Sequence, residues 1–407
     1  MYSGVLGDVP ENPLTAILGR KKLPRGTRRI VSAMSSRGPM SASELADHTG
    51  LAKSTISTVV TGLRDVGIVV DEPSAPKGVG RPSTPLALNP DLGTCVGVHM
   101  GYGTVSIMVA NVAHKVIKTC VEQVPPGYRA NHGADIAKKL IDRTYSELGL
   151  PKERLLGVGV SVAGPVARDG TIMHSSILPE MAGSNVLREF GRVLQVPILA
   201  ANESNCAAIS EMTWGAVIGE PSFVLFKIDL GVGGAIVQDG KIMQGIAGGG
   251  GEFGHVSIDS RGELCRCGNR GCIETSASLK KPMEQLARLK QREISFEDAV
   301  DLAKAGDADA VKMLLDVGKA AGRGLAVVCT ILNPPVVVLS GRLWLAGSLV
   351  MKPFIEAYEE TVLIKPQDIR PVDRTRIVIG KFTGEDSLRG AFGLVLREIG
   401  SVPVAAS

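Results

Sequence analysis

One pattern recurs along the chain and limits the folds it can adopt, namely a strand-like apolar stretch with glycines where the strands end. It occurs at 95–112, 155–172, 223–242 and 336–344. Helical patterns separate these runs, as at 134–148 and 307–332. Strands that alternate with helices, with glycines where the strands end, predict an α/β architecture.

The length of the chain predicts more than one domain, because 407 residues exceed one ordinary domain. The strand-like runs fall into two blocks, from which we expect a first lobe at 93–203 and a second lobe at 204–384, with a cleft between them. The last helical pattern, at 385–400, is expected to pack back on the first lobe. Residues 1–20 form an N-terminal extension to which the sequence assigns no role.

Positive charge is concentrated at the N-terminus. Residues 1–90 carry 11 basic and 7 acidic side chains, whereas the rest of the chain carries 34 of each. A local positive excess favours an anionic partner for that segment. No apolar run approaches the roughly 18 residues that span a bilayer, and the start lacks a signal-peptide pattern, so we expect a cytoplasmic protein that does not bind membranes.

Residues 21–90 have the pattern of a winged helix-turn-helix. Three short helices are expected, and the second opens with an S-x-x-E capping box at Ser41 and Glu44 and ends at Gly50. The third, from about Lys53, has an apolar face opposite a hydroxyl-rich face, and two strands around a Pro/Gly-rich tip would form the wing. The residues expected to contact a double-stranded DNA operator are Lys53, Ser54, Thr55, Ser57, Thr58, Lys77 and Arg81. A small helical protein-interaction module is the alternative.

A cluster of one histidine and three cysteines predicts a metal site. His255, Cys265, Cys267 and Cys272 form the pattern H-x9-C-x-C-x4-C in a glycine-rich loop at 255–274. Three thiolates and an imidazole complete a tetrahedral zinc site, and four protein ligands leave no position for a reactive water, so the zinc would be structural. Incidental cysteines or a redox pair are the alternatives. The remaining cysteines are expected to be buried free thiols: Cys95, Cys120, Cys206 and Cys329.

The stretch GEFGHV…CRCGNRGCIE resembles the signature of the ROK family, which comprises repressors, open reading frames and sugar kinases. This resemblance covers nearly the whole chain. It implies a two-lobed, actin-like (ribonuclease-H-like) sugar-kinase fold behind the DNA-binding head. It also implies a homodimer or homotetramer and a sugar bound between the lobes.

The resemblance extends to the sugar-contacting positions. ANESNCAA is similar to the family's E-N-D-A-N-A-A-A, GEFGH matches a second motif and CIE a third. The sugar-binding residues that the resemblance implies are Asn202, Glu203, Glu252, His255 and Glu274. Carboxylates, an amide and an imidazole also suit paired hydrogen bonds with neighbouring hydroxyls of a pyranose. His255 could bind zinc through one nitrogen and the sugar through the other.

The phosphate loops of the family's kinases are altered here. The first resembles G-I-D-I-G-G-T but reads GVHMGYG, with His99 in place of the aspartate and Tyr102 in place of a glycine. The second resembles L-G-T-G-I-G-G-G but carries Asp229 and Leu230. Imidazole is a poor ligand for Mg²⁺, and Asp229 would repel phosphates. Because Glu203 also replaces the aspartate at the position of the kinase base, we expect no catalytic residue.

The leading hypothesis is a sugar-responsive transcriptional regulator, a repressor of carbohydrate metabolism without kinase activity. One alternative is an active, ATP-dependent, glucokinase-like enzyme with a DNA-binding head. The other is a regulator that binds a protein partner while its sugar pocket is vestigial.

Overall fold

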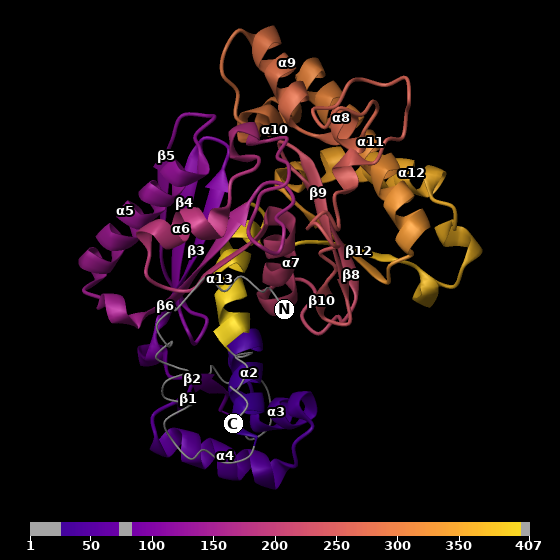
Figure 1. The fold of residues 1–407 in the computed structure, drawn as a ribbon. Helices are drawn as coiled ribbons and strands as arrows, with labels where there is room; N and C mark the ends of the chain where they lie inside the picture. The colour runs from indigo at the N-terminus through magenta and orange to yellow at the C-terminus, as the bar shows by residue number, and fades with distance from the viewer. Residues whose placement is uncertain (1–25, 73–83, 400–407) are drawn as a thin grey trace.

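The computed structural model describes residues 26–72 and 84–399. A small N-terminal head lies at one end of a two-lobed body, and α13 (Asp386–Ile399) runs from the body toward the head (Figure 1). The predicted fold class, a winged helix-turn-helix followed by a two-lobed α/β body, is confirmed. The predicted extension at 1–20 and the wing-tip residues Lys77 and Arg81 lie outside the described residues. Across 26–72 and 84–399, no helix has both the length and the apolar character of a membrane span.

The head contains the expected helices. They are α2 (Thr27–Arg37), α3 (Ala42–Thr49) and α4 (Lys53–Asp65). The predicted capping box is formed, because the Ser41 hydroxyl accepts from the Glu44 amide and the Glu44 carboxylate accepts from the Ser41 amide. Gly50 ends α3 at φ +67°, in the left-handed region that glycine adopts without strain. The wing strands β1 (Val69–Asp71) and β2 (Leu86–Leu88) pair antiparallel.

The head shares one hydrophobic core with the body. Ile30 and Met34 of α2 and the buried face of α4 belong to the same cluster as Phe392 and Leu396 of α13. A shared core restricts independent movement of the head, because separating the two parts would expose apolar surface to water.

The first lobe is a five-stranded mixed sheet in the order β5-β4-β3-β6-β7. Its strands are β3 (Thr94–Gly101), β4 (Thr104–Asn111), β5 (Val116–Gln123), β6 (Leu155–Val162) and β7 (Ile198–Asn202). α5 (Ala130–Leu148) and α6 (Val186–Val193) share a core with the sheet, whereas α13 packs on the strands through a different core. The approach of α13 requires glycine in β6, since a Cβ on Gly159 would lie 1.8 Å from the Ala391 carbonyl oxygen.

The second lobe repeats this topology with the sheet order β10-β9-β8-β11-β12. Its strands are β8 (Phe223–Ile228), β9 (Val232–Gln238), β10 (Lys241–Ile242), β11 (Val336–Ser340) and β12 (Arg376–Ile379). Its helices are α8 (Ile273–Ala277), α9 (Lys280–Lys290), α10 (Phe296–Lys304), α11 (Ala308–Leu332) and α12 (Ser348–Thr361). In each lobe an antiparallel meander is followed by two parallel strands.

The helix α7 (Glu203–Trp214) lies between the lobes. Cys206 contributes to the core around α13, whereas Ala207 and Ala208 contribute to a core with β8 and β9. The predicted boundary at 203 and 204 therefore falls at the first residue of a helix that contacts both lobes.

One prediction about the free cysteines is wrong. Cys95, Cys206 and Cys329 are buried as expected, but Cys120 is only half-buried. It lies on β5, which is the edge strand of the first sheet and is only partly covered.

Candidate functional site

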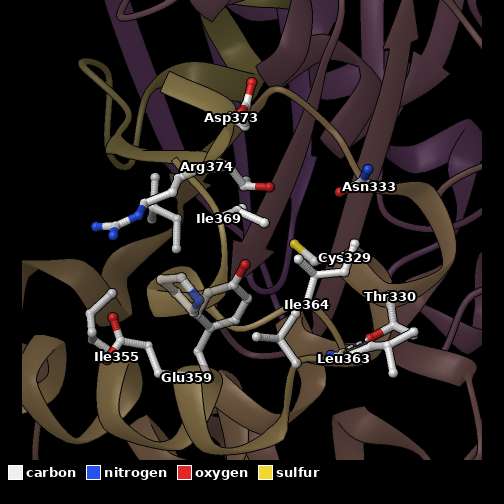
Figure 2. A pocket seen from close by; sticks show the side chains of 15 residues that line it. Cys329, Thr330, Asn333, Ile355, Glu359, Leu363, Ile364, Ile369, Asp373 and Arg374 are labelled. Atoms are coloured by element: carbon white, nitrogen blue, oxygen red, sulfur yellow. Dashed lines mark hydrogen bonds between the residues drawn. The ribbon is translucent and has the colours of Figure 1, made fainter. Parts of the chain in front are cut away.

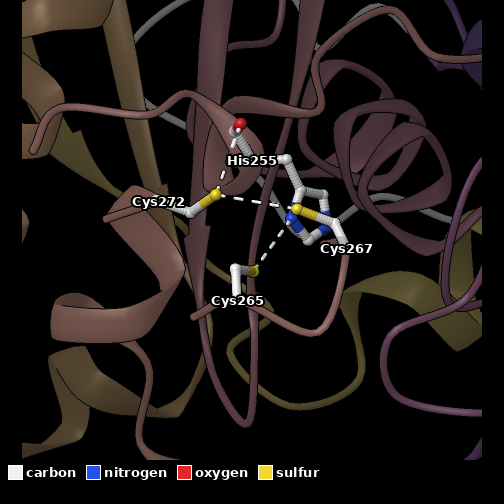
Figure 3. A group of neighbouring side chains, drawn as sticks. All are labelled: His255, Cys265, Cys267 and Cys272. Carbon is white, nitrogen blue, oxygen red and sulfur yellow. Dashed lines mark hydrogen bonds between the residues drawn. The ribbon is translucent and has the colours of Figure 1, made fainter. Parts of the chain in front are cut away.

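The predicted metal ligands converge on one point in the second lobe. The ligand atoms of His255, Cys265, Cys267 and Cys272 all lie within 4.8 Å of one another (Figure 3). The Cys265 sulfur is 3.6 Å from His255 Nδ1, and the Cys267 and Cys272 sulfurs are 3.6 Å apart. One imidazole and three thiols at these separations form a donor set that can hold a metal ion.

Glycine allows the metal loop to close. Gly271 has φ +59°, and a Cβ at this position would lie 1.8 Å from the Asp259 carbonyl oxygen. Gly268 has φ +95° between the second and third cysteines. A side chain at 271 would therefore displace the loop segment that brings Cys272 to the cluster.

The five residues assigned to a sugar come together at the edge of the metal loop. Asn202 ends β7 and caps α7, and its amide nitrogen donates to Glu252 Oε1 at 3.0 Å. His255 lies in the 3-10 turn η4 (Phe253–His255), with Nδ1 toward the cysteines and Nε2 at 4.0 Å from Glu252 Oε2. Glu274, in the first turn of α8, accepts from the Val232 amide at 3.1 Å.

This cluster is rich in carboxyl groups and largely buried. Burial raises the pKa of Glu252 to about 7, and the nearby charges of Glu203 and Glu274 act in the same direction. Burial also raises the pKa of Glu203, at the first position of α7. Carboxylates held in this way accept hydrogen bonds from a neutral donor such as a hydroxyl group.

The basic side chains near these carboxylates are paired with acidic side chains of the chain itself. Arg342 Nε donates to both carboxylate oxygens of Asp229 at 3.0 Å. Lys227 Nζ donates to Asp386 and to the Ser387 hydroxyl, each at 2.8 Å. Arg266 donates to Glu274 at 3.3 Å and to the Ser176 carbonyl oxygen.

Two family models match this chain. A family model described as "ROK family" matches residues 95–398. The chain belongs to the ROK family. A model described as "Bacterial regulatory protein, arsR family" matches residues 26–70, so a ROK body is joined to a bacterial regulatory helix-turn-helix.

Relatives of this ROK chain include regulators and a kinase. It is 25% identical to the xylose repressor of Caldicellulosiruptor bescii over 380 residues, which covers 89% of this chain and 93% of that protein. It is 26% identical to a glucokinase of Halalkalibacterium halodurans, over 67% of this chain and 87% of the kinase. The crystal structure of a ROK family transcriptional regulator, a homolog of the E. coli MLC protein, superposes with a TM-score of 0.72, at 23% identity, over 92% of this chain and 96% of that one.

The residues that depart from the kinase phosphate loops contact other side chains of the ROK body. His99 Nδ1 is 3.2 Å from the Ser161 hydroxyl, and burial together with the charge of Lys227 lowers the pKa of His99 to about 4, so its ring is neutral at neutral pH. The Tyr102 ring is exposed, and Lys280 Nζ of α9 lies 5.2 Å from its centroid. The carboxylate of Asp229 is compensated by Arg342, so it is not the free repelling charge that the sequence suggested.

Sequence reasoning missed four charged residues of the ROK cleft: Lys227, Arg266, Arg342 and Asp386. Lys227 carried a signal, because a lysine in the apolar run FVLFKI must find a buried partner. Its partner, Asp386, lies 159 residues away, and no local pattern indicates that distance.

The hydroxyl-rich face of α4 in the head points to solvent. Lys53, Ser54, Ser57 and Thr58 are exposed, Thr55 is half-buried, and the opposite face is buried. The residues proposed for DNA contact on this helix are therefore accessible.

A separate cavity of about 250 Å³ lies on the second lobe between the ends of α11 and α12 and the segment at 362–377 (Figure 2). Cys329, Tyr358 and Arg374 are among the residues that line it. None of the residues assigned to sugar, metal or DNA lines this cavity.

Proposed function

We propose that this ROK protein is a DNA-binding transcriptional repressor of carbohydrate metabolism that binds a sugar in the cleft between its lobes. The observation that carries the proposal is the combination, in one chain, of an exposed recognition-helix face with a ROK body in which His99 and Asp229 of the phosphate loops are bonded to other side chains. The first part can read an operator, and the second retains polar groups for a sugar.

The sugar is held by Asn202, Glu203, Glu252, His255 and Glu274. Glu252 and Asn202 form one hydrogen-bonded unit, which can present an acceptor and a donor to adjacent hydroxyls. His255 offers Nε2 to the same region, because its Nδ1 faces the cysteines.

The effector is an unphosphorylated sugar. A phosphate group needs an available cation, and each of the cleft cations described above, Lys227, Arg266 and Arg342, is engaged by a carboxylate. The binding residues add the carboxylates of Glu203 and Glu252, which would repel a phosphate at close range.

The metal is a structural zinc ion held by His255, Cys265, Cys267 and Cys272. The donor set suits zinc, and four protein ligands leave no coordination position for water. The ion would fix the His255 ring for the sugar and the start of α8, which carries Glu274.

On DNA, the protein acts as a homodimer or homotetramer. Two heads would place their α4 helices in successive major grooves of a palindromic operator, with Lys53, Ser54, Thr55, Ser57 and Thr58 at the bases and phosphates and Lys77 and Arg81 in the wing. Two-fold symmetry of the protein then matches that of the site.

A mobility-shift assay with the DNA upstream of its own gene tests the proposal. Wild-type protein is expected to retard this DNA, the combined substitution Ser54→Ala, Thr55→Ala and Arg81→Ala to abolish the shift, and Lys312→Ala on the exposed face of α11 to leave it intact. Calorimetry with a panel of free sugars and their phosphates should give heat with a free sugar alone. Failure of the wild-type protein to retard the DNA, or heat with sugar phosphates alone, would contradict the proposal.

A sugar kinase is the second candidate, favoured by the carboxylate of Glu203 at the position of the kinase base and by the kinase among the relatives. Incubation with ATP and glucose, xylose or an amino sugar tests it. We expect no sugar-dependent release of ADP, and a brisk sugar-stimulated rate would establish the kinase.

A further inference from the structure

A chain of hydrogen bonds joins the head to the body at Ser35 of α2. Its carbonyl oxygen is 3.0 Å from His114 Nε2, and its hydroxyl donates to the Leu396 carbonyl oxygen of α13 at 2.5 Å. On the other side of the His114 ring, the Trp214 indole N–H donates to Nδ1 at 2.9 Å. Three segments that are distant in sequence therefore meet at one imidazole.

The hydrogen bonds define the state of this imidazole. Because Nδ1 accepts the indole proton, the ring proton must be on Nε2, which then donates to Ser35. The ring is neutral at neutral pH, since burial lowers the pKa of His114 to about 4. A neutral ring with this tautomer satisfies both neighbours only in the observed orientation.

The position of His114 is tightly constrained. It lies in the turn between β4 and β5 at φ +68°, which is unusual for a residue other than glycine. A Cβ on Gly38, just after α2, would lie 3.2 Å from His114 Nδ1. Little space separates the ring from α2, so a displacement of the ring is transferred to the head.

The helix α7 connects Trp214 to the proposed sugar-binding residues. Trp214 is the last residue of α7, and Asn202 and Glu203 cap and begin the same helix. A helix of 12 residues is rigid and about 18 Å long. α7 also packs closely along α13, because a Cβ on Gly390 would lie 1.7 Å from the Cys206 carbonyl oxygen, and the Trp214 and Phe392 rings are 5.0 Å apart.

We propose that Trp214, His114 and Ser35 form a relay through which sugar bound at the start of α7 changes the position of the DNA-binding head. The relay rests on the proposed function, because it takes the sugar as its input and operator affinity as its output. Movement of α7 shifts the indole N–H, the His114 ring follows its hydrogen bond, and α2 moves with the ring. Trp214 and His114 are positioning residues and contact neither sugar nor DNA.

The test uses Trp214→Phe in the full-length protein, because phenylalanine keeps an aromatic ring but removes the indole donor. The matched control is Trp344→Phe, which removes the chain's only other tryptophan, a buried residue whose indole donates to the Ser340 carbonyl oxygen in the second lobe. Operator Kd is measured with and without saturating sugar, and sugar Kd is measured on free protein.

In the wild type and in Trp344→Phe, sugar is expected to change operator Kd by about 5–150-fold, the usual range of allosteric coupling. In Trp214→Phe this ratio should fall toward one while sugar Kd on the free protein stays within about twofold of wild type. His114→Asn is the second variant, since asparagine tolerates the left-handed backbone but is too short to bridge Trp214 and Ser35. It should lose the coupling in the same way.

The Trp344→Phe protein also contains Trp214 as its single tryptophan. Saturating sugar is expected to shift its emission, because the environment of the indole N–H changes.

A full wild-type ratio in both Trp214→Phe and His114→Asn would overturn the relay and leave the proposed function in place. An unchanged emission of Trp214 in a sugar-responsive protein would also overturn it. A wild type that binds DNA but no sugar removes the proposed function and the relay together.

Discussion

The proposed ROK cleft has two halves, the metal loop and the two phosphate loops, and these differ in the contacts that their side chains make. In the metal loop, four candidate ligand atoms converge within 4.8 Å of one another. The phosphate loops have His99, Tyr102 and Asp229 at altered positions, and each of these contacts another side chain of the protein.

This difference indicates that the two halves of the cleft are under different physical demands. A sugar site needs fixed donors and acceptors, and in the proposed function the metal loop would supply them through His255 and the start of α8. A nucleotide site needs open space and unpaired positive charge. Here Arg342 and Lys227 bond to Asp229 and Asp386 instead, so the positive charge in this half is already paired within the protein.

Removal of the metal is expected to have the largest effect. Structural zinc sites contribute on the order of 10 kcal/mol to folding. Cys267→Ser should lose bound zinc, melt at a lower temperature and bind no sugar, whereas Cys120→Ser outside the cluster should resemble the wild type. Metal content by atomic absorption, thermal melting and calorimetry measure the three properties. If the Cys267→Ser protein contains no zinc but binds sugar with the wild-type Kd, the metal loop does not support the sugar site.

The second-largest effect is expected from loss of the buried Lys227–Asp386 ion pair, near the phosphate loops. The side chains of Lys227 and Asp386 are only 9% and 2% exposed. Burial opposes the charge on Lys227, but the carboxylates of Asp386 and Glu203 outweigh it and raise its pKa. Asp386→Asn therefore leaves a buried charge uncompensated and should lower the free energy of unfolding by about 3–5 kcal/mol in urea.

The control for that substitution is an exposed ion pair. Lys312 and Asp316 on α11 are 75% and 58% exposed. Asp316→Asn should change the free energy of unfolding by no more than about 0.5 kcal/mol. Equal effects of Asp386→Asn and Asp316→Asn would mean that the internal pairs do not stabilise the cleft.

A smaller effect is expected at the sugar half. Asn202→Ala removes the hydrogen bond to Glu252 and should weaken sugar binding by about 1.5–3 kcal/mol, which is roughly 10–150-fold in Kd by calorimetry. Tyr102→Ala, in the first phosphate loop, should leave sugar Kd unchanged. If Tyr102→Ala weakened sugar binding and Asn202→Ala did not, the sugar would lie at the phosphate loops instead.

The smallest expected effect is on the pH dependence of stability. The pKa values of His99 and His114 are lowered to about 4 in the folded protein, against about 6.5 when unfolded. The stability that each neutral histidine contributes is complete above pH 6.5 and is lost as the pH falls toward 4, because the unfolded chain then binds more protons. Between pH 6.5 and 5, each histidine should lower the free energy of unfolding by on the order of 1–2 kcal/mol. His99→Asn should reduce the slope of unfolding free energy against pH, and an unchanged slope would show that His99 titrates normally.

Much of the fold could be predicted because its signals are local. The capping box at Ser41 and Glu44, the apolar face of α4 and the glycine-ended strands follow from periodicity and turn chemistry. The His/Cys cluster could also be predicted from the sequence, because its four residues lie within 18 residues of one another. Their loop needs glycine at 271 in order to close.

The local sequence pattern was sufficient to predict most helices and strands of this protein and the His/Cys cluster that can hold a metal ion. The tertiary structure alone decided that Asp229 meets Arg342, that Lys227 meets Asp386 and that Trp214 and Ser35 meet at His114. The members of these contacts lie between 79 and 159 residues apart. Side chains so distant are brought together by the packing of two sheets and of α7 and α13 between them, and no local periodicity encodes that packing.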